Sequence, residues 1–303
     1  MRTILFTLVL LTVFSAAAQN DAPDLEDEQA FRFAVQLQQK ELYDLAAAQF
    51  QEYAETYPTS FRAPVSLLRA AQNYEKADSL LKASNVYLSL LLKYPESAEI
   101  DQAQFSRAGL LAKTGQNRNA ALAYERLRVL DDGSPLITDA QLRAAEQYLA
   151  AGLYQKAMDA AFYVLEQEKN HLKRLNARYF VAKAHYGLYN YQDALQVLED
   201  FSSATLENDL EIQILALKSD VYEKLGRYSK ADSLVHFVLR QPVANPELGK
   251  MAVDLASSLH HQKRYAESDA VIELSLDKVK QDSLRNDLLF VFGDNAWAQG
   301  NYE

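Results

Sequence analysis

Residues 144–165 read AAEQYLAAGLYQKAMDAAFYVL, and this stretch contains one complete unit of a pattern that runs along the whole chain. Ala145 stands nine positions before Tyr154, and Ala157 stands three positions after it. Small residues at matching places let two helices approach closely. Gly152 lies between the two apolar stretches, where a glycine with a left-handed backbone commonly ends a helix. We therefore predict a helical hairpin whose second helix begins at Tyr154.

The pattern repeats every 37 residues without insertion or deletion, and we call the position of Tyr154 the anchor. The anchors are Tyr43, Leu80, Asn117, Tyr154, Tyr191, Tyr228, Tyr265 and Tyr302. Nine positions before them stand Ala34, Ala71, Ala108, Ala145, Ala182, Ser219, Ala256 and Gly293. Three positions after them stand Ala46, Ala83, Ala120, Ala157, Ala194, Ala231 and Ser268. Seven positions after them stand Phe50, Tyr87, Tyr124, Ala161, Leu198, Val235 and Ile272. A fixed period of this length predicts an array of helical hairpins.

This pattern resembles the tetratricopeptide repeat over residues 28–303. Its clearest matches are Gly152-x-Tyr154-x-x-Ala157 and Gly226-x-Tyr228-x-x-Ala231. The period of that family is about 34 residues, so each repeat of this chain is slightly longer. The resemblance implies an all-α fold, a right-handed α-solenoid of seven full hairpins and one further helix, fifteen helices in all. We call the first helix of each hairpin helix A and the second helix B.

Polar residues stand just ahead of the predicted helix A segments, as N-caps do. They are Asp24, Ser60, Ser97, Ser134, Asn170 and Asn245. Pro246 follows Asn245 at the expected first helical position, where the missing N–H of proline costs nothing. These residues support the register that the anchors define.

The first eighteen residues are typical of a secretory signal peptide. Arg2 supplies a positive charge, residues 4–14 are apolar, and residues 15–18 (SAAA) form a small-residue cleavage site. The alternative, a membrane span, needs roughly 20 apolar residues and is disfavoured by length. We predict a signal peptide at 1–18, a short acidic linker at 19–27 and helical repeats at 28–303.

The sequence contains no cysteine, which excludes disulfides, thiol catalysis and lipid attachment at a cleavage-site cysteine. We expect an exported protein, periplasmic or secreted, that does not insert into the membrane after its leader is removed. Tyr302 falls on the eighth anchor, and Phe290, Phe292 and Trp297 make the preceding segment apolar. Because repeat arrays usually end in a polar capping element, we expect more repeats or another domain beyond residue 303.

The residues offer little support for catalysis or cofactor binding. The formal net charge is −10, whereas nucleic-acid binding requires clustered positive charge. Phosphate-binding loops, nucleophile elbows and zinc-protease helices are absent from the sequence. His260 and His261 are adjacent and point apart on a helix, so a metal site would need Glu223 from a neighbouring hairpin. We predict no catalytic residue, no cofactor and no metal site.

The resemblance implies that helix A residues line a concave groove, at the positions 12, 8 and 5 before each anchor. The candidate partner-binding residues are Phe31, Leu68, Gln72, Phe105, Leu142, Glu146, Tyr179, Lys183, Tyr186, Asp220, Glu223, His260 and Trp297. Val35, Glu75, Val253 and Phe290 occupy the same columns. The alternative is that the aromatic column simply belongs to the core, because apolar residues are buried by default. Repeats that clamp a C-terminal carboxylate carry Lys and Asn on this wall, and this chain mostly lacks them there.

These features favour a non-enzymatic scaffold for protein–protein interaction in the bacterial cell envelope, similar to periplasmic tetratricopeptide proteins. Two alternatives remain open from the sequence. One is the helical arm of a larger envelope enzyme, such as a peptidoglycan-cleaving one, with its catalytic domain beyond residue 303. The other is a glycan-binding solenoid, which the single tryptophan makes weaker. The sequence does not identify the partner or the oligomeric state.

Overall fold

The computed structural model describes residues 21–199, 201, 209–241 and 245–301. The predicted signal peptide and Tyr302 therefore lie outside the described residues. The chain divides into two compact units, unit 1 (residues 1–151) and unit 2 (residues 152–303), and each is described by itself. Throughout the described residues the secondary structure consists of helices and turns, without strands.

Helices alternate between the two kinds that the register predicts. The helix A elements are α2 (Asp21–Gln39), α4 (Ala63–Lys76), α6 (Ile100–Lys113), α9 (Ile137–Ala150), α11 (His171–Gly187), α13 (Asp209–Lys224), α15 (Pro246–His261) and α17 (Asp282–Ala298). The helix B elements are α3 (Tyr43–Thr56), α5 (Leu80–Lys93), α7 (Asn117–Glu125) with α8 (Leu127–Leu130), α10 (Tyr154–Gln167), α12 (Tyr191–Glu199), α14 (Tyr228–Arg240) and α16 (Tyr265–Leu276). Only Arg126 separates α7 from α8, so the described part of the chain contains the fifteen helices that the sequence predicts. Every one of these helix B elements begins at its anchor.

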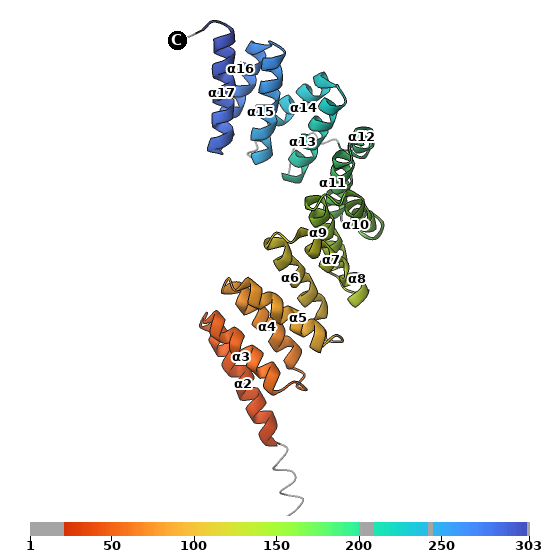
Figure 1. Ribbon diagram of the computed structural model, residues 1–303, viewed down its shortest axis with the longest axis vertical. Helices are drawn as coiled ribbons and strands as arrows, with labels where there is room; N and C mark the ends of the chain where they lie inside the picture. The colour runs from red at the N-terminus through yellow and green to blue at the C-terminus, as the bar shows by residue number, and fades with distance from the viewer. Residues whose placement is uncertain (1–20, 200, 202–208, 242–244, 302–303) are drawn as a thin grey trace, which may run out of the picture. The chain divides into compact units, whose positions relative to one another are not determined.

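Within each unit, helices pack mainly against their neighbours in the sequence, and Figure 1 shows this order from α2 to α9 and from α10 to α17. The small residue nine before the anchor is at most 3% exposed in seven of the eight helix A elements, all except α17. The small residue three after the anchor is at most 1% exposed in every helix B. These columns allow close helix contact, as predicted.

Direct contacts show which columns face each other inside a hairpin. The Ser268 hydroxyl, three after its anchor, donates to the Ala256 carbonyl, nine before the same anchor, over 2.8 Å. The rings of Phe31 and Phe50, twelve before and seven after Tyr43, pack edge to face with centroids 5.6 Å apart. The same two columns bring Phe105 and Tyr124 together, at 5.2 Å. One packing scheme therefore recurs in hairpins of unit 1 and unit 2.

Each hairpin turn uses a left-handed residue two positions before the anchor. Gly115, Gly152, Gly226 and Gly300 have φ between 69° and 79°. Glu41, Asp78, Tyr189 and Lys263 occupy the same column with φ between 56° and 62°. Side chains with a Cβ rarely adopt this conformation, because the Cβ approaches the following carbonyl. The turn geometry is thus shared by the turns that follow all eight helix A elements, and four of these turns have it without glycine.

This column predicts opposite effects for two substitutions. Gly226→Ala is expected to lower the unfolding free energy by about 1 kcal/mol, because alanine is strained at positive φ. Lys263→Gly is expected to leave stability unchanged or raise it, because the strain at φ 62° is relieved while glycine adds entropy to the unfolded chain. Urea unfolding of both variants measures these effects. A stabilising Gly226→Ala would contradict the shared turn geometry.

Some local predictions require correction. α2 begins at Asp21, so helical structure includes part of the 19–27 segment that was expected to be a linker, and Asp24 lies inside this helix instead of capping it. Ser60, Ser97 and Ser134 are not N-caps either, because α4, α6 and α9 have Arg62, Glu99 and Leu136 at this position. Asn170 and Asn245 are N-caps as predicted, and their side chains accept hydrogen bonds from the backbone N–H groups of Lys173 and Glu247. Among the described residues, no helix is long and apolar enough to cross a membrane.

Candidate functional site

The column twelve before the anchor was expected to form the floor of a binding groove. The structure places much of it inside the hairpins instead. Phe31 and Phe105 are half-buried against helix B rings, Leu68 packs on the core of unit 1, and Leu142 is 8% exposed. Phe31 and Phe105 face helix B because the residues seven after their anchors, Phe50 and Tyr124, are aromatic and meet them. The core alternative therefore describes this column better than an open aromatic wall.

The other candidates in unit 1 are dispersed. Glu146 of α9 pairs with Arg143 on the same helix, at 3.1 Å. Gln72 of α4 is half-buried, and the neighbouring Glu75 accepts a 2.5 Å hydrogen bond from the Tyr87 hydroxyl. A pocket of about 390 Å³ in this unit lies between α3, α4 and α5. It is lined by Gln51, Glu55, Leu67, Tyr74, Lys82, Asn85, Val86 and Ser89. The pocket does not coincide with the predicted groove positions.

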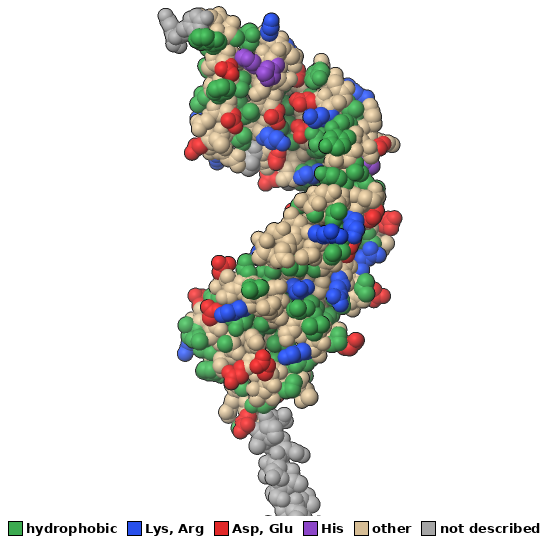
Figure 2. Space-filling model, viewed as in Figure 1, with side chains coloured by type: hydrophobic (Ala, Val, Ile, Leu, Met, Phe, Trp, Pro, Cys, Tyr) green, Lys and Arg blue, Asp and Glu red, His purple; other side chains and the backbone are tan. Residues whose placement is uncertain are grey.

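In unit 2 the predicted residues of α11 and α13 do lie near one another, and residues of α15 join them. We call the surface formed by Tyr179, Tyr186, Asp220, Glu223, Glu247 and Asp254 the acidic face. Figure 2 shows acidic and basic side chains beside hydrophobic ones over α13 and α15. Lys183, on the next turn of α11, places its ammonium 5.5 Å from the centre of the Tyr179 ring.

The electrostatics of the acidic face are dominated by partial burial, with repulsion between carboxylates and an opposing attraction from Lys250 as smaller effects. Burial raises the pKa of the Asp220 carboxyl, and the charges of Asp254 and Glu247 raise it further, against an opposing effect of Lys250. Burial likewise raises the pKa of Glu223, and Asp220 and Asp254 add to this shift. Desolvation by surrounding groups also raises the pKa of Asp254. Ionising these carboxyls together is therefore costly in the free protein.

Tyrosines of the acidic face experience the same negative field. Burial raises the pKa of the Tyr179 hydroxyl to about 12, and Glu247 and Asp220 contribute to the shift. Burial also raises the pKa of Tyr186, with Asp220 the next contribution. The nearby positive charges that act on these carboxyls are Lys250, which lowers the pKa of Asp220 and Asp254, and Lys224, which lowers that of Asp220 and Glu223. Acidic groups outnumber these lysines among the charges that act on Asp220 and Glu223 taken together, so a cationic ligand would be attracted to this surface.

An open pocket of about 700 Å³ adjoins the acidic face. It lies between the end of α13, the start of α14 and the second half of α15, and Glu223 and Asp254 line it. The remaining lining residues are Tyr228, Ser257, Ser258, His261 and Gln262. Tyr228 is 54% exposed, so an aromatic ring stands beside two carboxylates at the surface.

The remaining candidates have other roles. His260 Nδ1 lies 2.7 Å from the Asn295 side-chain oxygen, so this imidazole links α15 to α17. The described residues contain no group of three or more His, Asp or Glu side chains that could hold a metal ion. Trp297 is 71% exposed on α17 and does not belong to the acidic face.

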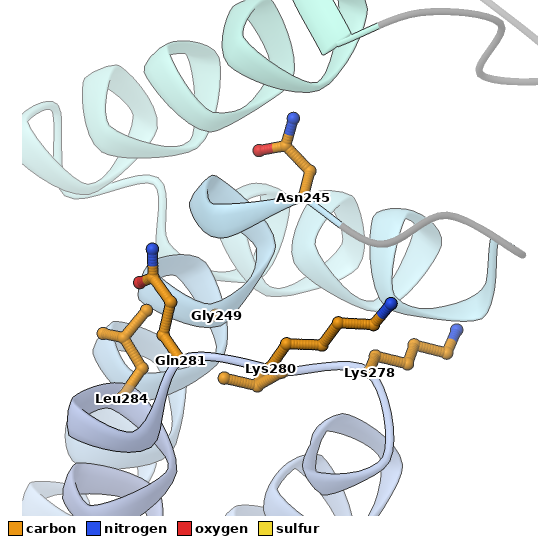
Figure 3. A pocket seen from close by; sticks show the side chains of 7 residues that line it. Asn245, Gly249, Lys278, Lys280, Gln281 and Leu284 are labelled. Carbon is orange, nitrogen blue, oxygen red and sulfur yellow. The ribbon is translucent and has the colours of Figure 1, made fainter.

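A second pocket in unit 2, of about 190 Å³, lies at the base of the last hairpins (Figure 3). Asn245, the N-cap of α15, and Gly249 of α15 line it, together with residues of the turn before α17. The Lys278 ammonium donates to the Gln241 carbonyl over 2.8 Å and is already engaged. A Cβ on Gly249 would lie 2.8 Å from a methyl of Leu284, so the glycine permits close helix packing here. We therefore attribute this pocket to helix packing and not to ligand binding.

Two members of the acidic face were not predicted. Asp254 stands eleven positions before its anchor, and Glu247 stands eighteen before it. Asp254 could have been predicted from the helical spacing. The positions eleven and eight before the anchor are three residues apart and therefore share a helix face. Glu247 lies two turns further along that face, next to the cap at Asn245.

Comparisons with known proteins agree with this architecture. The sequence model of the family described as Anaphase-promoting complex, cyclosome, subunit 3 matches residues 113–201. No curated protein sequence matches the chain. A tetratricopeptide repeat protein from Parabacteroides merdae is similar in structure, with a TM-score of 0.55 and 15% identity over 88% of this chain and 98% of that one.

Two further solved structures are similar at the level of the fold. PilW, described as a type IV pilus biogenesis factor, has a TM-score of 0.50 and 15% identity over 74% of this chain and 97% of its own. The apo form of RapI has a TM-score of 0.51 and 12% identity over 91% of this chain and 99% of its own. At these identities the likeness concerns the fold alone. The chain therefore has the fold of tetratricopeptide-type helical repeats.

Proposed function

We propose that this protein is an exported, non-enzymatic scaffold of the bacterial cell envelope that binds a protein or peptide through helix A residues of unit 2. Helical repeats of this type generally bind proteins or peptides. The observation that carries the proposal is the acidic face, where three partly buried carboxylates with raised pKa values lie near tyrosine rings and an open pocket. Export is supported by the sequence of residues 1–18.

The chemistry of the acidic face favours a basic segment of the partner. A lysine or arginine placed there would pair with Asp220, Glu223 or Asp254 and would offset their mutual repulsion. The alkyl part of such a side chain would lie against a tyrosine ring, and its charge would interact favourably with the ring face. The acidic face therefore fits an extended or helical segment that presents several cationic side chains.

The binding test uses the chain without residues 1–18 and two fluorescent peptides of equal length, one rich in lysine and arginine and one in which glutamine replaces these residues. We expect saturable binding of the basic peptide, and an affinity that falls steeply as salt rises. Simultaneous Asp220→Asn and Asp254→Asn substitutions are expected to weaken it by at least about tenfold, or about 1.4 kcal/mol.

Glu52→Gln and Glu166→Gln provide the matched control, because both carboxylates are exposed on helix B elements and the net charge changes equally. Equal losses with the two pairs would mean that only overall charge matters, and would count against a site at the acidic face. Export is tested separately, by N-terminal sequencing of the protein recovered from a periplasmic fraction. A mature protein that retains Met1 in the cytoplasm would exclude the envelope assignment.

A further inference from the structure

The pocket of unit 1 lies between α3 and α5 and over α4, which are consecutive helices (Figure 1). Contacts at both ends show that α3 and α5 run parallel and in register. The hydroxyl of Ser79, just before α5, donates to the carboxylate of Asp44 in the first turn of α3 over 3.5 Å. The hydroxyl of Tyr94, just after α5, donates to the carbonyl of Pro58, just after α3, over 3.0 Å. The pocket is therefore a short groove along two parallel helices.

The groove has an apolar floor and polar walls. Its floor consists of Leu67, Tyr74 and Val86, each at most 8% exposed. The polar residues come from both α3 and α5 and include amide, hydroxyl and charged groups. They are Gln51, Glu55, Lys82, Asn85 and Ser89. A ligand that fits this groove has small apolar groups on one side and hydrogen-bonding groups along its length.

The two charged groups stand at opposite ends of the groove. Glu55 stands twelve after the anchor of α3, and Lys82 stands two after the anchor of α5. Ten helical positions, or about 15 Å along the helix axis, therefore separate them. The Lys82 ammonium lies 5.3 Å from the centre of the Tyr74 ring, which holds it beside the floor. The groove thus has a negative end at Glu55 and a positive end at Lys82.

These opposed charges are specific to this groove. At the next pair of helix B elements, α5 and α7, Leu92 and Asn119 occupy the columns of Glu55 and Lys82. The repeat pattern therefore does not require the two charges. They are also too far apart to pair with each other, because about 15 Å exceeds the screening length in physiological salt. A ligand with a charge at each end can pair with both.

We propose that this groove binds a short peptide with free termini, whose amino group pairs with Glu55 and whose carboxylate pairs with Lys82. An extended peptide advances roughly 3.3 Å per residue, so about three or four residues bring its two termini to these side chains. Gln51 and Asn85 each offer a donor and an acceptor, as the main-chain groups of a peptide require. Small side chains lie against Leu67. The site belongs to unit 1 and is independent of the acidic face.

The test titrates the 303-residue chain with tetraalanine in a calorimeter at pH 7, where both peptide termini are charged. We expect saturable binding. Acetylation of the peptide removes the charge that Glu55 recognises, and amidation removes the charge that Lys82 recognises. Each blocked peptide is expected to bind about tenfold more weakly, because one charge-assisted hydrogen bond is lost.

Two variants assign each terminus to a side chain. Glu55→Gln is expected to weaken binding of the free peptide about tenfold and to leave binding of the acetylated peptide unchanged, because that interaction is already absent. Lys82→Gln is expected to act in the same way on the free and the amidated peptide. Both side chains are exposed, so the circular dichroism of the variants should match that of the unchanged chain.

Glu52→Gln and Lys93→Gln are the matched controls, because both residues are exposed on the same two helices and do not line the groove. They should leave all three affinities unchanged. Absence of tetraalanine binding would overturn the proposal. So would variants that weaken both blocked peptides equally, since the termini would then not be recognised. A neutral trisaccharide that binds more tightly than tetraalanine would assign the groove to a different class of ligand.

Discussion

Replacement of Phe50 by alanine is expected to lower the unfolding free energy by about 3–5 kcal/mol. Phe50 is 0% exposed, and its ring packs edge to face on Phe31, so the truncation removes a large buried side chain and leaves a cavity. The loss should be large because Phe50 holds helix B of the first hairpin against helix A. It also packs in the core cluster that continues into α4 and α5.

Urea unfolding followed by circular dichroism measures this effect, and Phe61→Ala is the matched control. Phe61 belongs to the same unit but is 81% exposed, so its removal should change stability by less than about 1 kcal/mol. In an array with mainly nearest-neighbour contacts, the loss should be local. Hydrogen exchange should therefore show faster opening of α2 to α4, with α15 and α16 unaffected. Equal costs for Phe50→Ala and Phe61→Ala would mean that the anchor register is incorrect.

The fold was predictable because one physical requirement recurs at a fixed spacing. Two helices can approach closely only where both have small residues, and the alanine columns record that requirement in each repeat. The anchors located the start of helix B to the residue, since the turn two positions earlier has the same left-handed geometry whether it is formed by Gly226 or by Lys263. The periodicity of the sequence was therefore sufficient to predict the starts of the helix B elements and the close helix contacts within the hairpins.

The binding surface was less predictable. A column of the repeat shows which helix face a residue occupies, but it does not show whether the neighbouring helix buries that residue. Phe31 and Leu142 share their column with Tyr179. Phe31 packs against the ring of Phe50 and Leu142 is buried, whereas Tyr179 lies near the carboxylates of Glu247 and Asp220. The acidic face arises because Asp220, Glu223 and Asp254 come from two successive helix A elements. Their proximity depends on the packing of α13 against α15, which no single repeat reveals.

Neutralising the acidic face is expected to stabilise the free protein while it weakens binding. Partial burial and neighbouring charges raise the pKa of Asp220, so its ionised form is unfavourable in the folded state. Asp220→Asn removes that charge and retains the side-chain volume. At pH 7 we expect a higher Tm for the variant and a weaker affinity for the basic peptide. Opposite signs of this kind indicate a residue kept for function at a cost in stability.

The pH dependence follows from the direction of the same shift. Because the folded-state pKa of Asp220 lies above its unfolded value, the folded state binds more protons between the two pKa values. Stability therefore falls as pH rises through this window, and the penalty is absent below the unfolded value, about pH 4. The Tm advantage of Asp220→Asn should be full at pH 7 and should vanish near pH 4.

Binding should show the opposite trend, since a cationic segment requires ionised carboxyls. The affinity of the wild-type chain for the basic peptide should decline from pH 7 toward pH 4, and peptide binding should release protons in calorimetry at intermediate pH. Glu199→Gln, at an exposed carboxylate of α12 outside the acidic face, should change neither the Tm nor the binding. If Asp220→Asn instead lowered the Tm at pH 7, the carboxylate would be a structural partner in the folded chain, and the acidic face would lose its role as an open binding surface.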